Sequence, residues 1–350
     1  MREKLNTLRV MAELGELKRL NPIPKIETPE SLWLGMKPEE GQMRQGPLTV
    51  SAFGFDPPDR STHFHVSLLG HMDGQVVQTP EVIRQEDLSK ILEEAKRLNA
   101  KSLTFLSGEM QDHALVWESL GDMHTTPASE AVGKPLKPNL PEGDGDRELR
   151  RFIDDSINIL TGLELNERRI DEGLAPLNLL WPWGHGIRKP VPNLLLKRGE
   201  RAQVESSSLR QAGLTRLVGY RHGDRQAFGR RVNTKLERLA KIALENELTI
   251  FLIDAPEELR QKNMQEELHW FVSELDNTLL KPIFDNAIKS RSRVSIIAPG
   301  ETEGLSLNFE TGMSNANPYP FDERSLEERS LPKSDAWTEI ERALIPTTGA

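Results

Sequence analysis

The sequence predicts an α/β fold in which helices cover both faces of a central sheet. From about residue 147 onward, helical patterns alternate with strand patterns. The strands at 248–254 and 293–299 are apolar at almost every position. Strands buried on both faces have this continuous apolar character, and the alternation is typical of a sheet covered by helices. We find no internal repeat.

Composition narrows the class of protein. The 350 residues are enough for one large domain or two moderate ones. The formal net charge of −9 argues against a nucleic-acid-binding protein that relies on phosphate contacts. The chain has no cysteine, which excludes disulfides, thiolate metal sites and cysteine nucleophiles. We find no signal peptide and no run of about 20 apolar residues that could span a membrane. We therefore expect a soluble, cytoplasmic protein without nucleic-acid or membrane partners.

The first part of the chain predicts a mixture of helices and strands. The expected elements are a helix at about 5–20, two strands at 48–55 and 62–70 around a Pro-Pro turn, an amphipathic helix at 85–99, and strands within 101–108 and 113–120. Residues 126–146 are rich in proline, glycine and acidic residues and predict a linker.

The second part predicts the alternating pattern. The expected elements are a helix from about 147, a strand at 202–206, helices at 207–214 and 233–246, the strand at 248–254, a long helix at about 257–281 and the strand at 293–299. The tail from about 322 is polar, and we expect it to be mobile.

Common catalytic motifs are absent from the sequence. No strand is followed by a phosphate-binding glycine loop of either usual type. Neither G-x-S-x-G nor H-E-x-x-H occurs. P-loop enzymes, Rossmann dehydrogenases, serine hydrolases and zincins are therefore set aside.

One short stretch is unusual. Residues 175–186, APLNLLWPWGHG, contain two of the six tryptophans, Trp181 and Trp183, followed by His185 between two glycines. From about 150 to 285 the order of features resembles the archaeal-type cofactor-independent phosphoglycerate mutases of the alkaline phosphatase superfamily. The run LNERRIDEGLAPLNLLWPWGHG is similar to that family's Asn-x-x-Arg, glycine, Ala/Pro-x-Asn and Trp-x-Trp-Gly-x-Gly. Lys235 and the segment TIFLIDAPEEL also match.

The resemblance implies an architecture. It predicts an alkaline-phosphatase-like central sheet sandwiched by helices, with a smaller inserted α+β domain. On this basis we expect a core formed by 1–44 and 145–350, and an inserted domain at 45–144 that ends in the linker. The family's first strand, which ends in Asp-Gly, has no counterpart in this chain. We expect the sheet to expose an edge that favours pairing with a partner.

The resemblance also implies a chemistry that this chain does not retain. In the family, two divalent metals flank a serine nucleophile and clamp the attacking and leaving oxygens. Here Ile26 falls at the serine and Glu27 at its neighbouring aspartate. A metal-binding Asp and His of the family fall on Glu257 and Gln261, and the later Asp-His pair is replaced within 299–302. Two residues stand where arginines of the inserted domain would be expected, namely Gln45 and His65.

Other side chains remain candidates for binding a ligand. They are Asn166, Arg169, Asn178, Trp181, Trp183, His185, Arg221 and Lys235. For the two asparagines and Arg169, the alternative is a buried polar network that braces the tryptophan block. For the tryptophans it is a packed corner. Arg221 and Arg225 could hold a phosphate or carboxylate, or could lie in a solvated loop.

The remaining candidates are acids and histidines. Asp254 and Glu257 follow a strand, at the position where α/β proteins place their sites, and are weak catalytic candidates. Alternatively, they cap the helix that follows. His63 and His65 could bind a metal from one side of a strand, or could be half-buried without that role. Residues 269–271, HWF, predict a core contact.

We interpret the chain as a phosphoglycerate-mutase-like pseudoenzyme that has lost two-metal phosphoryl transfer. It would need no metal or cofactor and would bind a phosphorylated small molecule or a protein partner. The alternative is an active 2,3-bisphosphoglycerate-independent mutase that interconverts 2- and 3-phosphoglycerate with two metals such as Mn or Zn. A third interpretation is an enzyme of changed chemistry that uses Asp254, Glu257 or the histidines.

Overall fold

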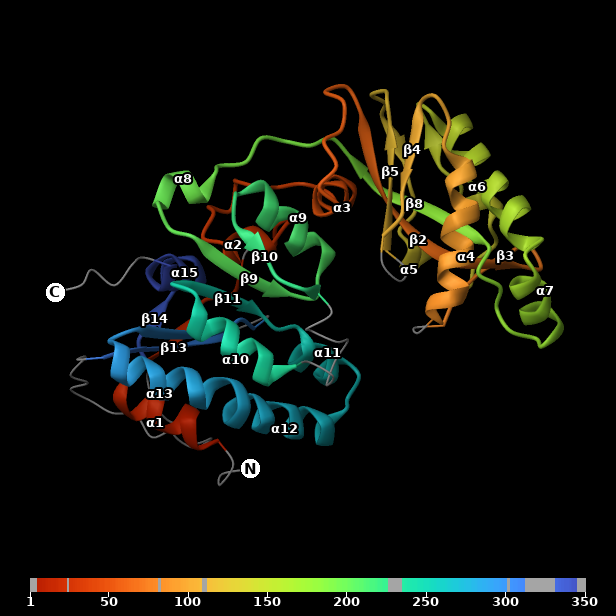
Figure 1. The fold of residues 1–350 in the computed structure, drawn as a ribbon. Coiled ribbons are helices and arrows are strands. Elements are labelled where there is room, and N and C mark those ends of the chain that lie inside the picture. The colour runs from red at the N-terminus through yellow and green to blue at the C-terminus, as the bar shows by residue number, and fades with distance from the viewer. Residues whose placement is uncertain are drawn as a thin grey trace. The chain divides into compact units, whose positions relative to one another are not determined.

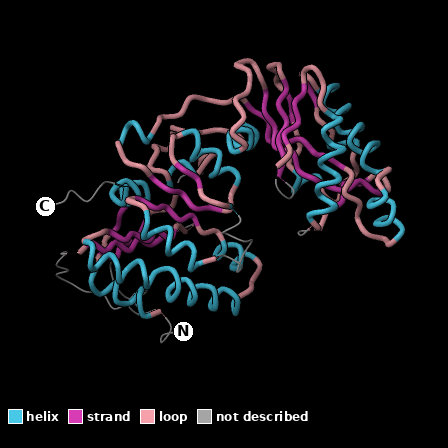
Figure 2. Tube along the Cα trace, in the orientation of Figure 1, coloured by secondary structure: helices cyan, strands magenta, loops and turns pink. Residues whose placement is uncertain are grey.

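The computed structural model describes residues 5–23, 25–80, 83–108, 112–225, 235–300, 303–311 and 331–344. The chain divides into two compact units (Figures 1 and 2). The core unit comprises Met1–Gln42, Val191–Ser208 and Leu217–Ala350. The inserted unit comprises Met43–Pro190 and Leu209–Arg216. No helix in the described ranges has the length and apolar character that crossing a membrane requires.

The inserted unit is larger than the inserted domain that we expected at 45–144. It runs on to Pro190 because β8 (Leu179–Gly186) pairs with β2 (Thr62–Met72). The expected linker at 126–146 also lies inside this unit, where it forms short elements. The tryptophan block therefore belongs to the inserted unit.

The inserted unit contains most of the short elements of the chain. After α3 (Gln45–Ala52) and β2 they are β3 (Gln75–Val77), α4 (Gln85–Ala95), η1 (Lys96–Leu98), β4 (Leu103–Leu106), β5 (Asp112–Trp117), β6 (Met123–His124), α5 (Ala128–Ala131), η2 (Lys137–Asn139), β7 (Glu142–Gly143), α6 (Asp146–Thr161), α7 (Glu164–Asp171), β8 and α9 (Leu209–Leu217). The strands expected in 62–70, 101–108 and 113–120 and the helices expected at 85–99, from 147 and at 207–214 are confirmed.

β2 is the central strand of this unit. β5 pairs antiparallel with one edge of β2, and β4 extends the sheet beyond β5. β8 and β3 pair with β2 along successive parts of its other edge. β6 and β7 form a separate pair.

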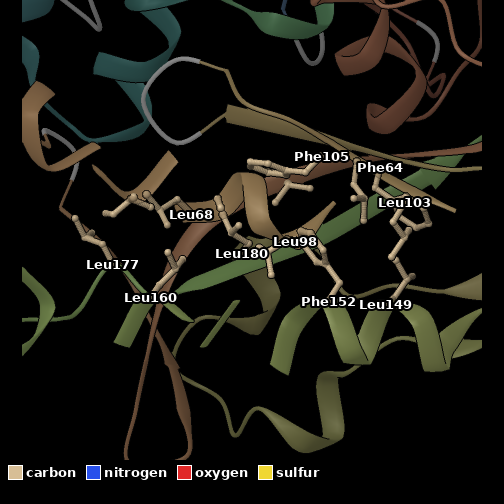
Figure 3. Packing of buried hydrophobic residues seen from close by; sticks show 14 of the residues in the cluster. Phe64, Leu68, Leu98, Leu103, Phe105, Leu149, Phe152, Leu160, Leu177 and Leu180 are labelled. Atoms are coloured by element: carbon tan, nitrogen blue, oxygen red, sulfur yellow. The ribbon is translucent and has the colours of Figure 1, made fainter. Parts of the chain in front are cut away.

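Alternating residues of β2 serve the two faces of the sheet. Phe64, Val66 and Leu68 are fully buried in a cluster that includes residues of α4 and α6 (Figure 3). Figure 1 shows these two helices on the same face of the sheet. On the opposite face, Thr49 of α3 contacts His65. β2 is therefore covered on both faces along most of its length, which explains why His63 and His65 are buried.

The segment expected as a strand at 48–55 is instead the helix α3, so that prediction was wrong. Pro47 lies in the first turn of α3, where its missing N–H is not needed. The hydroxyls of Thr49 and Ser51 donate to the carbonyls four residues earlier. Gly46 lies so close to β2 that a Cβ there would overlap the carbonyl of His63. Tertiary packing thus overrode the strand-like composition of this segment.

The core unit contains the longer alternating elements. They are α1 (Asn6–Leu14), β1 (Glu16–Leu20), α2 (Glu30–Trp33), α8 (Leu194–Arg198), β9 (Ala202–Ser206), β10 (Arg221–His222), α10 (Leu236–Glu245), β11 (Leu248–Leu252), α11 (Ala255–Gln261), α12 (Gln265–Glu274), η5 (Leu275–Leu280), α13 (Lys281–Ser290), β12 (Arg293–Ala298), β13 (Gly304–Glu310), β14 (Lys333–Ser334) and α15 (Ala336–Leu344). The strands predicted at 202–206, 248–254 and 293–299 are confirmed.

Two sheets are described in this unit. One is parallel, with the order β10-β9-β11. The other has the order β12-β13-β1-β14, in which β13 runs antiparallel to both of its neighbours. Leu236 and Leu239 of α10 share a buried cluster with Leu279 and with Phe251 of β11, so helices cover the parallel sheet on this side.

The helix expected at 5–20 ends at Leu14, and the rest forms β1. Gly15 is extended and packs so tightly that a Cβ there would overlap the carbonyl of Asn308 in β13. The long helix expected at 257–281 is also interrupted. Asn263 has φ +55°, which ends α11 and starts the new helix α12. The backbone conformations of Gly15 and Asn263 therefore interrupt the two helices that hydrophobic periodicity had predicted as continuous.

Part of the polar tail is ordered rather than mobile, contrary to expectation, because a buried carboxylate attaches α15 to the sheet. Glu339 is 1% exposed. Its carboxylate accepts hydrogen bonds from the Lys18 ammonium at 3.0 Å, the Ser334 hydroxyl at 2.7 Å and the Asn308 amide at 2.9 Å. Three satisfied contacts allow this charge to be buried.

A second buried carboxylate, Asp276 in η5, caps a distant helix. α1 has no side-chain cap of its own. The two carboxylate oxygens of Asp276 accept from the backbone N–H groups of Thr7 at 3.0 Å and Leu8 at 2.8 Å. A negative charge at a helix N-terminus is stabilising. This contact joins two segments separated by 269 residues.

We predict that Asp276→Asn lowers the free energy of unfolding of the core unit by about 1–3 kcal/mol, because the amide replaces an acceptor with a donor against a buried N–H. Urea denaturation measures the change. Asp285→Asn is the matched control, because Asp285 forms only an exposed i,i+4 pair with Lys281 and should cost less than about 0.5 kcal/mol. Equal costs for the two variants would contradict the capping role.

Candidate functional site

The tryptophan block is a strand rather than the packed corner that we expected. Residues 179–186 form β8, whose register with β2 pairs Trp181 with Ser67 and Trp183 with His65. Among the described strands, β8 pairs only with β2. Pro182 is tolerated because an edge strand can lack one donor on its free side.

The two tryptophans hold β8 in place through their ring N–H groups. Trp181 is fully buried, and its Nε1 donates to the carbonyl of Thr126 at 2.8 Å. Nε1 of Trp183 donates to the Ser67 hydroxyl at 2.9 Å. The ring of Trp183 lies edge-on to His65, with centroids 5.0 Å apart. Both indoles thus use their polar atoms inside the unit.

Asn166, Arg169 and Asn178 brace the loop that leads into β8. The amide of Asn166 donates to the carbonyls of Leu160 and Leu177 and accepts from the Leu177 N–H. Arg169 donates to the Ala175 carbonyl at 2.8 Å. Asn178 bonds the backbone of His71 in both directions. These contacts favour the buried-network interpretation over direct ligand contact.

His185 at the end of β8 holds an arginine. Nε2 of His185 lies 3.0 Å from NH1 of Arg44, and Nδ1 lies 3.0 Å from the Thr125 hydroxyl. Because a guanidinium only donates, Nε2 must be the acceptor and Nδ1 must carry the proton. Burial and the neighbouring cation of Arg44 lower the pKa of His185 to about 4. A neutral imidazole therefore orients Arg44.

A second arginine reaches the same turn of α3. NH1 of Arg210 on α9 donates to the side-chain oxygen of Gln45 at 3.2 Å. The Gln45 amide contacts the Thr49 hydroxyl at 3.4 Å, and that hydroxyl lies 3.1 Å from Nδ1 of His65. α9 can approach α3 closely because Gly213 has no side chain. A Cβ at that position would overlap the carbonyl of Leu48.

We call this group, Arg44, Gln45, His65, His185 and Arg210, the α3 cluster. Arg44 is at the N-cap position of α3 and is exposed, and Arg210 is half-buried. The free N–H groups of a helix N-terminus favour anions, and guanidinium groups bind phosphate and carboxylate through paired hydrogen bonds. The arrangement is suited to binding a small anion.

The possible metal pair His63 and His65 is confirmed to lie on one strand, but the two residues have different surroundings. Nε2 of His63 lies 2.9 Å from the Ser61 hydroxyl, which itself donates to Pro58. Nε2 of His65 faces Asp112 at 3.7 Å. Within the described ranges, no three His, Asp or Glu side chains gather in a way that could hold a metal ion.

Arg221, Lys235, Asp254 and Glu257 belong to the core unit. Arg221 and Lys235 are exposed. Arg225 donates to the Ser207 carbonyl at 3.0 Å, and residues 226–231 of the same arginine-rich stretch lie outside the described residues. The structure therefore does not bring these residues together with the tryptophan block inside one unit.

Asp254 and Glu257 differ in their surroundings. Asp254 occupies the N-cap position of α11 but makes no side-chain cap. Asp254 as a whole residue is exposed, but the protein that surrounds its carboxyl group, together with the carboxylates of Glu258 and Glu30, raises its pKa to about 6. Glu257 is exposed, and hydrogen bonds from Arg260 lower its pKa. Neither acid caps α11 through its side chain.

Sequence reasoning missed the two arginines of the α3 cluster. We took Gln45 to occupy an arginine position, although Arg44 directly precedes it. Arg210 is in a helix and had no local motif. The core contact expected for 269–271 is correct only for Phe271, since Trp270 is 52% exposed. Shifting the alignment with the family by one residue would have placed Arg44, instead of Gln45, at the expected arginine position.

No family model matches the chain. A 2,3-bisphosphoglycerate-independent phosphoglycerate mutase of Methanothrix thermoacetophila is 23% identical over 323 residues, which cover 89% of this chain and 81% of that protein. The enzyme of the same name from Methanosarcina mazei is 22% identical over 297 residues, or 82% of this chain and 74% of the relative.

Solved structures agree in fold. The cofactor-independent phosphoglycerate mutase of Thermoplasma acidophilum superposes with a TM-score of 0.61 at 17% identity, covering 97% of this chain and 90% of the other. A Pyrococcus horikoshii protein superposes with a TM-score of 0.74 at 17% identity, covering 97% and 89%. The predicted alkaline-phosphatase-like α/β fold and the predicted resemblance are both confirmed. The chain is a relative of the cofactor-independent phosphoglycerate mutases.

Buried histidines predict an acid-sensitive inserted unit. Burial lowers the pKa of His63 and His185 to about 4 and that of His113 to about 3, whereas an unfolded histidine titrates near about 6.5. Between those values the unfolded chain binds more protons than the folded one. Stability is therefore present above pH ~6.5 and is lost as the pH falls toward ~4.

Urea denaturation at several pH values measures this slope. His113→Asn should reduce the pH dependence of the free energy of unfolding by up to about one bound proton, because asparagine does not titrate. Asn can still accept from the Gly108 N–H that now bonds Nδ1 of His113 at 3.0 Å, so the native contact is retained. The control His269→Asn changes an exposed histidine and should leave the slope unaltered. A slope that His113→Asn does not change would contradict the prediction.

Proposed function

We propose that this mutase relative has lost two-metal phosphoryl transfer and acts as a non-catalytic protein that binds a small phosphorylated molecule. The α3 cluster is the binding site in this proposal.

The contacts of Glu257 carry the proposal. By the resemblance, this carboxylate stands where the family has a metal ligand. Its two oxygens accept from Nε of Arg260 at 2.8 Å, NH2 of Arg260 at 2.7 Å and Nε2 of Gln261 at 2.9 Å. A divalent cation at this carboxylate would have to displace a guanidinium or be repelled by it. Gln261, which stands for the family's histidine, donates to the same carboxylate and is not oriented as a ligand.

The nucleophile position is equally unsuited to phosphoryl transfer. Ile26, which aligns with the family's serine, packs against a buried cluster that includes Leu20 and Leu32. The nearby hydroxyl of Ser31 is fully buried and donates to the Thr28 carbonyl at 2.8 Å. An apolar side chain therefore stands at the nucleophile position, and the hydroxyl of Ser31 is already engaged in a hydrogen bond.

Ligand binding does not need those lost groups. Arg44 and Arg210 place two guanidinium groups at the N-terminal turn of α3, and His185 keeps Arg44 oriented while remaining neutral. Two permanent cations at the N-terminal turn of a helix attract a phosphate or a carboxylate. A phosphorylated carboxylic acid carries both.

A second candidate function is the active mutase that interconverts 2- and 3-phosphoglycerate with two divalent metals. The similarity over 89% of the chain to a protein of that name favours it. The third interpretation, changed chemistry at Asp254, draws support from a pKa raised to about 6, a value useful for general acid–base work near neutral pH.

We predict no mutase rate. Purified protein with 3-phosphoglycerate, Mn²⁺ and excess enolase should show no formation of product above the enzyme-free background. Elemental analysis should find well under one Mn or Zn ion per chain. A measurable rate together with about two metal ions per chain, as a two-metal mechanism requires, would establish the active mutase and reject the proposal.

We also predict that Arg44→Met weakens the binding of 3-phosphoglycerate at least about tenfold, because a charge-assisted hydrogen bond is lost. Isothermal titration measures the affinity. Arg44→Lys keeps the charge and should lose less. Arg97→Met is the matched control, since Arg97 forms an exposed pair with Glu94 on the surface of the same unit. Equal affinities in the Arg44 and Arg97 variants, or no binding by the unaltered protein, would contradict the assignment of the α3 cluster.

A further inference from the structure

A groove on the surface of the core unit is lined by residues of α10, α12 and η5. Figure 1 shows α10 beside these two consecutive helices. The groove has a volume of about 500 Å³, which lies within the range of small-molecule sites. Leu236 of α10 and Phe271 of α12, which are 8% and 1% exposed, supply its buried apolar lining. None of the lining residues belongs to the α3 cluster, so the groove is a separate site.

Helical spacing places the polar side chains of the groove on its two walls. Trp270, Glu274 and Thr278 follow one another at intervals of four residues, and Arg238 and Lys241 are three residues apart. Residues three or four apart share a helix face. The Thr278 hydroxyl donates to the Glu274 carboxylate at 3.4 Å, as this spacing requires. Thr278 lies in η5, which is a π-helix, and such helices are rare and frequent at functional sites.

Trp270 forms an aromatic wall of the groove. A core contact was expected for residues 269–271, but Trp270 is 52% exposed. Single exposed apolar side chains are common on protein surfaces. Trp270 differs from them because it lines a groove whose apolar residues Leu236 and Phe271 are buried. An indole in this position offers a surface on which a planar ring can stack.

The charges of the groove favour an anionic ligand. Three cations and two carboxylates line it, namely Lys235, Arg238, Lys241, Glu237 and Glu274. The whole chain has 54 acidic against 45 basic residues, so this local excess of cations is opposite to the overall balance.

Lys241 is the cation that is available for a ligand. Arg238 is already paired with Asp224 at 3.0 Å. Lys241 is exposed and makes no ion pair with the described part of the chain. An ammonium group binds phosphate as a point charge. The α10 wall therefore offers a position for one phosphate group.

The opposite wall offers an acceptor. The carboxylate of Glu274 has about four lone-pair sites. Its contact with Thr278, at 3.4 Å, is longer than an ordinary hydrogen bond between oxygens. Glu274 can therefore accept from an N–H donor of a ligand. The groove thus combines a stacking surface, an acceptor and a cation.

We propose that this groove binds a nucleoside monophosphate whose base carries an amino group, such as an adenine nucleotide. The base stacks on Trp270, its amino group donates to Glu274 and its phosphate meets Lys241. An aliphatic phosphate would leave Trp270 unused, and an amine without an anionic group would leave Lys241 unmatched. The proposal does not depend on the function proposed for the α3 cluster.

The first test uses the full chain and AMP as the probe. Isothermal titration should show saturable binding, and the base should quench tryptophan fluorescence. Trp270→Ala should weaken AMP binding at least about tenfold, because base stacking is lost. Ile288→Ala is the matched control. Ile288 is 45% exposed on α13, and its replacement should leave the affinity unchanged.

The second test separates the phosphate from the base. Lys241→Met should weaken AMP binding about threefold to tenfold and leave adenosine binding unchanged, because adenosine has no phosphate. Lys289→Met, which removes an exposed lysine of α13, should change neither. Glu274→Ala should reduce the preference for AMP over IMP, because IMP has a carbonyl where AMP has the amino group.

Several results would overturn the proposal. One is the absence of saturable AMP binding, and another is equal affinity in the Trp270→Ala and Ile288→Ala variants. A third is an equal loss of AMP and adenosine binding in Lys241→Met. If Trp270→Ala fails to fold, this comparison of AMP with adenosine still decides the question.

A further variant distinguishes the groove from the α3 cluster. Arg44→Met should leave AMP binding unchanged, because Arg44 does not line the groove. If Arg44→Met removes AMP binding while Trp270→Ala retains it, the nucleotide binds at the α3 cluster and the proposal is wrong. Failure of 3-phosphoglycerate to bind would contradict only the function proposed for the α3 cluster.

Discussion

The inserted unit depends on the antiparallel pairing of β2 with β8. These strands are separated by more than a hundred residues, and their ladder runs from His63 opposite Gly186 to Leu69 opposite Leu179. The pairing carries the tryptophans into the sheet and places His185 beside Arg44 at the start of α3. Two close helix contacts, at Gly46 and Gly213, then bring Arg210 to the same turn. The members of the α3 cluster come from four separate segments. The pairing of β2 with β8 and the close helix contacts bring these segments together.

In the core unit, two buried carboxylates connect segments that lie far apart in the chain. Asp276 caps α1, and Glu339 attaches α15 to the sheet through Lys18, Ser334 and Asn308. Glu257 is exposed and accepts hydrogen bonds from Arg260 on the same helix. Burying an unpaired charge is costly. The hydrogen-bond donors around Asp276 and Glu339 compensate for the burial of these two carboxylates.

The elements predicted most accurately from the sequence were those whose hydrophobic pattern continues without a break. α4, α6 and α10 follow their helical periodicity, and β11 and β12 follow their apolar runs. The failures have separate causes. α3 looked like a strand until its hydroxyls bonded back to the preceding turn and Gly46 met the backbone of β2. The long helix was divided by the positive φ of Asn263. The tryptophan block looked like a corner because its proline and glycines are common in turns, yet an edge strand also tolerates them.

By itself, the sequence predicted the fold class and the resemblance to the mutases, because both depend on local patterns and residue identities. Only the tertiary structure decided which side chains meet. It showed that Asn166 and Asn178 brace a loop, and that Arg44 and Arg210 reach the same turn of α3. Such contacts join segments far apart in the chain, and neither their geometry nor their burial is encoded in any short stretch of residues.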